Sequence, residues 1–302
     1  DNLYILIDER TSIPIELQPY VAEFIRRVLL PSRKVTVKIA SLEYRSRFSL
    51  PLEGGGVVGF ELGPDIAANL DLDDYYVYDR NSDKVVDIFL ELLFNHLGAE
   101  LPDNFWPSRN IKGLAGFRAR LFTEPATFVE LVRAGEGVVR DFLGVFTSAF
   151  FRAVREGKSK VDLSSVEEAA RDWYETDKST ALSTEQHDAL HKIMSEVIGT
   201  RQAKMFMLAR EHADHLMIQS LFDLRILHLI SRGYSDKENP GLRYNIYSLD
   251  YGTYVDLKRT KSEPEPFLDI EGLEPGEAAD RIVPFADKRS IRRIILNPEI
   301  FD

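Results

Sequence analysis

The order of apolar and polar positions predicts a mixed α/β start to the chain. Residues 3–7 form an unbroken apolar run, "LYILI", which predicts a buried strand. Residues 16–30 carry apolar side chains at helical spacing, and residues 35–41, "VTVKIAS", are rich in β-branched side chains. Strand, helix and strand in this order indicate a parallel β-α-β unit.

The chain becomes helical after a loop-like segment at residues 51–75. The glycine-rich stretch "EGGGVVGFELGP" in this segment does not end in Gly-Lys-Ser/Thr, so it is not expected to bind phosphate. Helices are predicted at residues 82–98, 124–137 and 137–157. Capping-box patterns at Ser164–Glu167 and Ser183–Gln186 predict the starts of two more helices.

The pattern changes again in the last third of the chain. Residues 203–209 read as a short strand, residues 211–219 and 221–232 as helices, and residues 243–259 as a hairpin around "DYG". Helix, short strand, two helices and hairpin are the order of a winged-helix domain. The chain thus divides into residues 1–80, 81–160, 161–259 and an acidic, proline-containing tail, 260–302, in which "RIVPF" and "RRIILNPEIF" are apolar enough to dock elsewhere.

Composition excludes several kinds of chemistry. The chain has 302 residues and no cysteine, which excludes disulfides and thiolate metal sites. Its net charge of −11 argues against a general nucleic-acid binder. Because no apolar run reaches the roughly 18 residues that span a bilayer, we expect no membrane contact and a cytoplasmic location.

Two carboxylates, Asp8 and Glu9, directly follow the first predicted strand. A strand-end Asp that binds Mg²⁺, followed by a Glu that orients the attacking water, is typical of P-loop nucleotide hydrolases. The alternative is an ordinary strand that ends in a solvated acidic turn. Ser41 ends the second predicted strand, where it could contact a γ-phosphate, and Arg45 and Arg47 follow it.

The order of these features resembles the AAA+ ATPases, and most of all their origin-recognition/initiator branch. "LYILIDE" is similar to the Walker B strand, "KIAS" to the sensor 1 strand, and "GVVR", which ends at Arg140, to the sensor 2 pattern. The resemblance implies ATP and Mg²⁺ as cofactors. It implies Asp8 as the metal ligand, Glu9 as the catalytic base, and Ser41 and Arg140 as contacts to the nucleotide phosphates.

The resemblance also implies a fold and partners. The fold would be a partial P-loop α/β core, a mainly α-helical lid and a C-terminal winged-helix domain. Arg45 or Arg47 would act as an arginine finger towards a neighbouring subunit, so self-association or a protein partner is expected. The function would be that of a regulatory ATPase; the alternatives are a non-catalytic winged-helix adaptor and a DNA-binding, initiator-like protein.

One motif of the family is missing. The sole Gly-Lys-Ser, "GKS" at 157–159, has Arg152 where a Walker A loop has its first glycine, and it follows a predicted helix. We therefore expect a helix C-terminus at Gly157. The chain is then expected to be the C-terminal part of a longer ATPase and to bind nucleotide poorly by itself.

DNA binding is not favoured by the predicted winged helix. Its expected recognition helix, "LFDLRILHLIS", offers Arg225 and His228 but is mostly apolar. The expected hairpin carries Arg243, Lys258 and Arg259 away from its acidic and aromatic tip.

Two other patterns are interpreted as structural. The histidine pairs 187/191 and 212/215 have metal-ligand spacing but no supporting ligands, so surface positions are favoured. A group of aromatic residues is expected in the core between lid and winged helix: Phe146, Phe150, Phe151, Trp173 and Tyr174.

Overall fold

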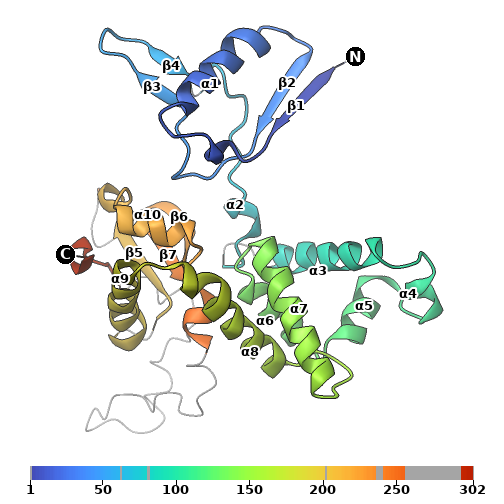
Figure 1. The fold of residues 1–302 in the computed structure, drawn as a ribbon. Helices are drawn as coiled ribbons and strands as arrows, with labels where there is room; N and C mark the ends of the chain where they lie inside the picture. Colours follow the sequence, from blue (N-terminus) through green and yellow to red (C-terminus); the bar gives the residue numbers. More distant parts are fainter. Residues whose placement is uncertain are drawn as a thin grey trace. The chain divides into compact units, whose positions relative to one another are not determined.

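A computed structural model describes residues 2–61, 63–79, 82–200, 203–235, 241–255 and 294–301 (Figure 1). It is a mixed α/β structure, mostly helical, with small sheets. The chain forms two compact units, Asp1–Asp71 and Leu72–Asp302, called unit 1 and unit 2 below.

Unit 1 contains the predicted β-α-β arrangement. Strand β1 (Leu3–Ile7) pairs in parallel with β2 (Val35–Ile39). Between them lies helix α1 (Gln18–Phe24), which continues as the π-helical turn η2 (Ile25–Leu29). Ala22 and Ile25 of this helix pack against the sheet in a small apolar cluster. The predicted strand, helix and strand are confirmed.

The prediction that β1 is buried is wrong. Tyr4 and Leu6 are 59% and 73% exposed, whereas Ile5 and Ile7 are half-buried. Side chains alternate between the two faces of a strand, and the helix covers the face that carries Ile7. The other apolar face of β1 is therefore open among the described residues.

Residues 49–59 form a hairpin where a loop was expected. Strand β3 (Ser49–Pro51) pairs with β4 (Val57–Gly59), and the positive φ angles of Gly55 and Gly56 permit the turn between them. The backbone N–H of Gly59 donates to Glu23 Oε2 on α1 at 2.8 Å, which ties the hairpin to the helix. Hydrogen bonds from Arg26, from this N–H and from Arg27 lower the pKa of Glu23 to about 2.

Unit 2 begins with a layer of helices around one apolar core. The described helices are α2 (Asp73–Tyr76), α3 (Ser82–Ala99), α4 (Phe105–Ser108), α5 (Gly113–Leu121), α6 (Pro125–Ala134), α7 (Val139–Arg155), α8 (Leu163–Trp173) and α9 (Thr184–Met194). Of the predicted aromatic core residues, Phe146 is buried in this core, and Trp173 and Tyr174 pack against it while partly buried. Phe150 and Phe151 are exposed on α7, so the prediction is wrong for them.

The two expected capping boxes have different outcomes. The Ser183–Gln186 box is present at the start of α9. The Ser164–Glu167 box is not, because Asp162 caps α8 and its Oδ1 accepts the N–H of Ser165 at 3.0 Å.

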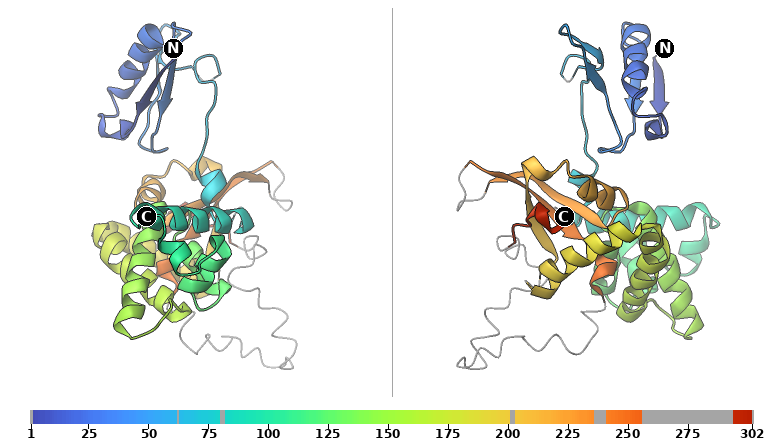
Figure 2. Two further views of the ribbon diagram at one scale, coloured as in Figure 1. Left: turned by 90° about the vertical axis from the view of Figure 1, so that its right-hand side faces the viewer. Right: turned by 60° about the vertical axis from the view of Figure 1, so that its left-hand side comes forward.

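A three-stranded antiparallel sheet follows, in the order β5 (Met205–Ala209), β7 (Arg243–Leu249), β6 (Leu227–Ser235). Helix α10 (Leu216–Asp223) connects β5 to β6 and packs beside β6 and α9 (Figure 2). The expected helix at 221–232 and hairpin at 243–259 are wrong. Arg225 adopts φ 60°, which ends the helix, and Tyr251–Thr253 is a 3-10 turn, η7. Residues 256–259 lie outside the described part.

The end of the chain docks on this sheet. The N–H of Met207 donates to Ile294 O and the N–H of Leu296 donates to Met207 O, both at 2.8 Å. Ile294 and Leu296 are buried, so the predicted docking of "RRIILNPEIF" is confirmed for its described residues. The stretch "RIVPF" lies outside the described residues.

Candidate functional site

The carboxyl ends of β1 and β2 bring the first candidate residues to one sheet edge. Ile7 pairs with Ile39, and the N–H of Ala40 donates to Ile7 O at 2.8 Å. Asp8 and Ser41 therefore follow the carboxyl ends of two neighbouring parallel strands and lie at the same edge of the sheet. In open α/β sheets this edge is where ligands bind.

Asp8 and Glu9 are both exposed at this edge. The N–H of Glu9 donates to Asp8 Oδ1 at 2.8 Å, and Glu9 has left-handed backbone angles, φ 49° and ψ 33°. Among the described residues no cluster of three or more metal-ligating side chains occurs. A pair of carboxylates still suits Mg²⁺, which commonly takes one or two carboxylates and completes its shell with phosphate oxygens and water.

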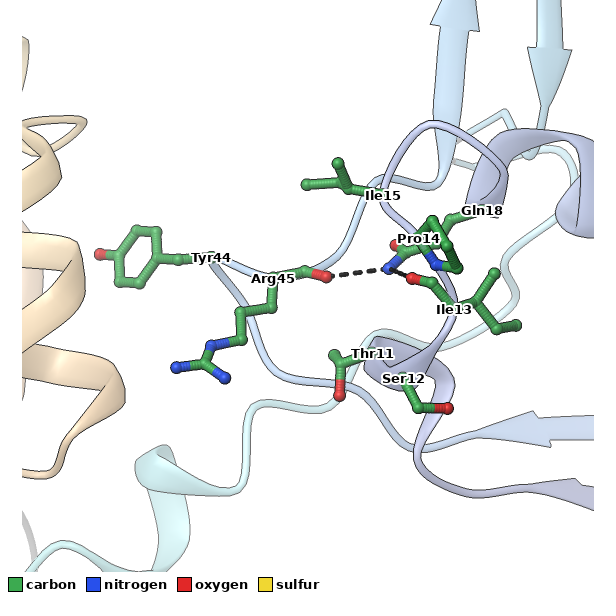
Figure 3. A pocket seen from close by; sticks show the side chains of 8 residues that line it. All are labelled: Thr11, Ser12, Ile13, Pro14, Ile15, Gln18, Tyr44 and Arg45. Carbon is green, nitrogen blue, oxygen red and sulfur yellow. Dashed lines mark hydrogen bonds between the residues drawn. The ribbon is translucent and has the colours of Figure 1, made fainter. Parts of the chain in front are cut away.

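Two residues that the sequence did not single out organise this edge. Arg10 follows Glu9 directly and is buried, and Gln18 is buried at the start of α1. Figure 3 shows the Gln18 side-chain amide between the carbonyl oxygens of Ile13 and Arg45, to which it donates at 2.9 and 3.1 Å. Apolar periodicity carries no signal for such contacts.

The segment after β2 borders an open cavity of about 310 Å³. Arg45 lines it together with Thr11, Ser12 and Tyr44. Arg45 and Arg47 are both exposed at their side chains, while their backbones contact the Gln18 amide. Unit 1 thus contains Asp8, Glu9, Ser41, Arg45 and Arg47. Arg140 belongs to unit 2, where it is exposed in the first turn of α7.

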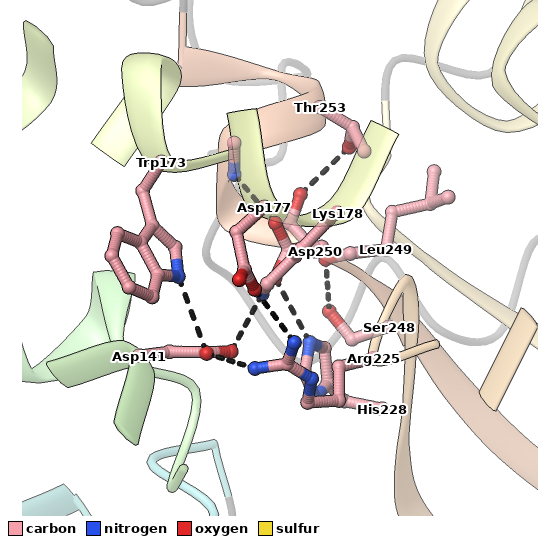
Figure 4. A network of polar contacts seen from close by, with 11 residues as sticks. Asp141, Trp173, Asp177, Lys178, Arg225, His228, Ser248, Leu249, Asp250 and Thr253 are labelled. Carbon is pink, nitrogen blue, oxygen red and sulfur yellow. Dashed lines mark hydrogen bonds and ion pairs between the residues drawn. The ribbon is translucent and has the colours of Figure 1, made fainter. Parts of the chain in front are cut away.

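Asp141, the neighbour of Arg140, lies in a buried ionic network (Figure 4). Its Oδ1 accepts hydrogen bonds from Arg225 and from Trp173 Nε1, and its Oδ2 lies 2.9 Å from Lys178 Nζ. Lys178 also pairs with Asp250. The network joins the helices to the end of β7.

Further contacts extend the network. Arg225 donates to Asp177 Oδ2 at 2.7 Å, and His228 Nε2 lies 3.1 Å from Asp250 Oδ2. Burial would raise the pKa of Asp250, but Lys178 and His228 outweigh it and lower that pKa to about 2. Burial likewise opposes the charge of Lys178, but Asp250 and Asp141 raise its pKa.

Unit 2 contains further buried polar contacts. Lys204 Nζ donates to Asp79 Oδ2 at 2.6 Å, and Tyr251 Oη donates to Glu130 Oε1 at 2.7 Å. Glu136 is also buried, with a positive φ of 45°, and burial raises its pKa. These polar groups are enclosed and hold segments distant in sequence together.

The network corrects the expected recognition helix. Arg225 and His228 do not lie on a helix: Arg225 follows the end of α10, and His228 belongs to β6. Both side chains are engaged by carboxylates. Arg243 begins β7, pairs with Ser235 at the end of β6, and donates to Gly233 O. Lys258 and Arg259 lie outside the described residues.

The Gly-Lys-Ser stretch is a helix terminus, as predicted. Helix α7 ends at Arg155, Gly157 has φ 71°, and the N–H of Lys158 donates to Ala153 O at 2.9 Å. Lys158 pairs with Glu156 and Asp162.

Comparisons with known proteins return no match: no family model, no curated protein and no solved structure corresponds to this chain. Among the described residues, no helix has both the length and the apolar character needed to cross a membrane.

Proposed function

We propose that this chain is the C-terminal portion of a regulatory AAA+ ATPase and that the carboxyl ends of β1 and β2 form the metal and water side of its ATP site. The observation that carries the proposal is the parallel pairing of Ile7 with Ile39, because it sets Asp8 and Glu9 beside Ser41 at one sheet edge. In this role Asp8 binds Mg²⁺, Glu9 accepts a proton from the attacking water, and Ser41 contacts the γ-phosphate.

Bound Mg²⁺ would supply charge neutralisation for the phosphates. By the resemblance to sensor 2, Arg140 of the helical lid, formed by α3 to α7, would be an arginine that contacts the phosphates. Arg45 or Arg47 would act as the finger towards a neighbouring subunit. A phosphate-cradling loop is also required. Residues 1–302 contain no complete Gly-x-x-x-x-Gly-Lys-Ser/Thr motif. We therefore propose that a segment outside these residues supplies the phosphate-binding loop.

Exposed apolar surfaces of unit 1 support this reading. Tyr4 and Leu6 are open on one sheet face, and Tyr20, Phe24 and Val28 are open along the outer side of α1 and η2. Parallel sheets are normally covered on both faces, and an apolar surface of this kind is typical of a contact site. Further strands and helices of a P-loop core would cover it.

The C-terminal part of unit 2 supports a winged helix. The order α9, β5, α10, β6, β7, with β7 central in the sheet, follows that fold except at one place. Between β5 and β6 the 3-10 turn η6 (Arg210–His212) stands where the fold has the first of its two helices. Helix α10, "LMIQSLFD", carries no Lys or Arg for phosphate contacts. The winged helix is therefore proposed to bind a protein, under control of the nucleotide state, more readily than DNA.

A second candidate is a non-catalytic winged-helix adaptor whose ATPase remnant is structural. The outer face of α7 favours it, since Val139, Phe151 and Val154 are exposed there and would suit a protein contact.

Replacing Glu9 by Gln in the full-length protein separates the two candidates. The ATPase proposal expects ATP binding to persist while hydrolysis falls about 100-fold or more. Glu53→Gln removes the same charge at an exposed turn of unit 1 and should leave hydrolysis unchanged. A wild-type protein that hydrolyses no ATP would favour the adaptor.

A further inference from the structure

The Arg10 side chain is buried in unit 1 without an acidic partner. It is 1% exposed, and no carboxylate in the described part of the chain forms an ion pair with it. Its Nη1 donates to Gln18 Oε1 at 3.2 Å, and its Nη2 donates to Gln18 O at 3.2 Å and to Arg47 O at 2.7 Å. The guanidinium also lies 4.1 Å from the centre of the Phe48 ring. Burial lowers the pKa of Arg10.

Both ends of the Gln18 side-chain amide contact the backbone of residues 45–47. Its Oε1 accepts from Arg10 and from the N–H of Arg47, the latter at 2.8 Å. Its Nε2 donates to the carbonyls of Ile13 and Arg45. The side chain therefore makes two acceptor and two donor contacts, which only an uncharged amide can do.

These contacts form a clamp, defined as the side chains of Arg10 and Gln18 with the backbone of residues 45–47. A buried cation without an acid is costly, and an apolar side chain of similar volume would stabilise the core at less cost. An Arg at this position is explained by its planar guanidinium, whose N–H groups point in fixed directions and so hold the Arg47 carbonyl in one orientation.

We propose that Arg10 and Gln18 are positioning residues that hold the arginine-bearing segment 45–47 in register with the Asp8–Glu9 turn. The inference rests on the proposed ATP site and adds to it two residues that touch neither metal nor nucleotide. Arg10 directly follows Glu9 in the chain. The clamp therefore holds the Asp8–Glu9 turn and the segment with Arg45 and Arg47 in a fixed position relative to each other.

The Gln18→Glu variant tests the clamp selectively. The new carboxylate keeps the acceptor contacts to Arg10 and Arg47. It loses both Nε2 donations and sets an oxygen against the carbonyls of Ile13 and Arg45. We expect faster amide hydrogen exchange in residues 44–48 and a kcat for ATP that is about 10- to 100-fold lower, because small displacements of catalytic groups have effects of this size. The KM for ATP and the midpoint of thermal unfolding should stay near the wild-type values.

Two other variants complete the experiment in the full-length protein. Arg10→Lys keeps the charge but not the fork, and it should also lower kcat. Gln219→Glu adds the same charge to α10 in unit 2 and should change neither quantity.

Wild-type kcat in Gln18→Glu, or unchanged exchange in residues 44–48, would overturn the clamp while leaving the ATPase proposal intact. A fall in kcat that only accompanies a large drop in the unfolding midpoint would also overturn it. Absence of hydrolysis in the wild type would instead refute the proposed function.

Discussion

Replacing Asp141 by Asn should destabilise unit 2 strongly. Asp141 is fully buried and faces Lys178, Arg225 and the Trp173 indole. Removing one partner of a buried ion pair costs about 3–5 kcal/mol because the remaining charges lose their compensation. Asn keeps one oxygen that accepts hydrogen bonds, so we place the loss near the lower end, at about 3 kcal/mol. In a unit of this size that lowers the thermal midpoint by about 6–12 °C.

Tryptophan fluorescence during urea unfolding measures this effect in unit 2 alone. Both tryptophans of the chain, Trp106 and Trp173, lie in that unit. Asp214→Asn is the matched control, because it removes the same charge at an exposed position, and it should change the unfolding free energy by less than about 0.5 kcal/mol. If Asp141→Asn behaved like this control, the buried network would not stabilise the unit and the reasoning would fail.

Two further changes probe the same core. The variant Asp250→Asn tests stability in acid. The pKa of Asp250 in the folded protein, about 2, lies below that of an Asp in the unfolded chain. The carboxylate therefore stabilises the fold above about pH 4, and this stabilisation is lost as the pH falls through about 2. The difference in unfolding free energy between wild type and variant should therefore shrink by about 2 kcal/mol from about pH 5 to pH 2, and a difference that stays constant over this range contradicts it. Gly144→Ala should destabilise by about 1–3 kcal/mol, since the added Cβ would lie 2.4 Å from Trp173 Cη2. In the control Gly98→Ala, the added Cβ would lie 3.6 Å from its nearest neighbour, so the variant should be neutral or more stable by up to about 1 kcal/mol. If urea unfolding gave the same change in free energy for both variants, the Trp173 side chain would have moved aside without cost.

Local pattern was sufficient for some elements and misleading for others. The apolar run and the β-branched stretch predicted β1 and β2 correctly, because both strands follow directly from their own sequence. Strand β6 was mistaken for a helix, because Leu229 packs into the main core and Ile230 into a second cluster, so burial on both faces removes the alternation that marks a strand.

The site depends on contacts that no local pattern contains. Asp8, Glu9 and Ser41 could be singled out because each stands at the end of a strand. Arg10 and Gln18 were missed, because the carbonyl that Arg10 contacts belongs to Arg47, and its approach depends on how the chain folds back. Likewise Asp141 meets Arg225 from 84 positions away, and Lys178 meets Asp250 from 72.

Metal-directed cleavage tests the proposed ATP site most directly. Fe²⁺ in place of Mg²⁺, with ATP, ascorbate and peroxide, cleaves the backbone next to the bound metal of the full-length protein. The proposal predicts ATP-dependent cuts at residues 8–10 and 40–42, on the two strand ends joined by the Ile7–Ile39 pair, and their loss in Asp8→Asn. ATP-dependent cleavage confined to other segments, or cuts at residues 8–10 that persist in Asp8→Asn, would contradict it.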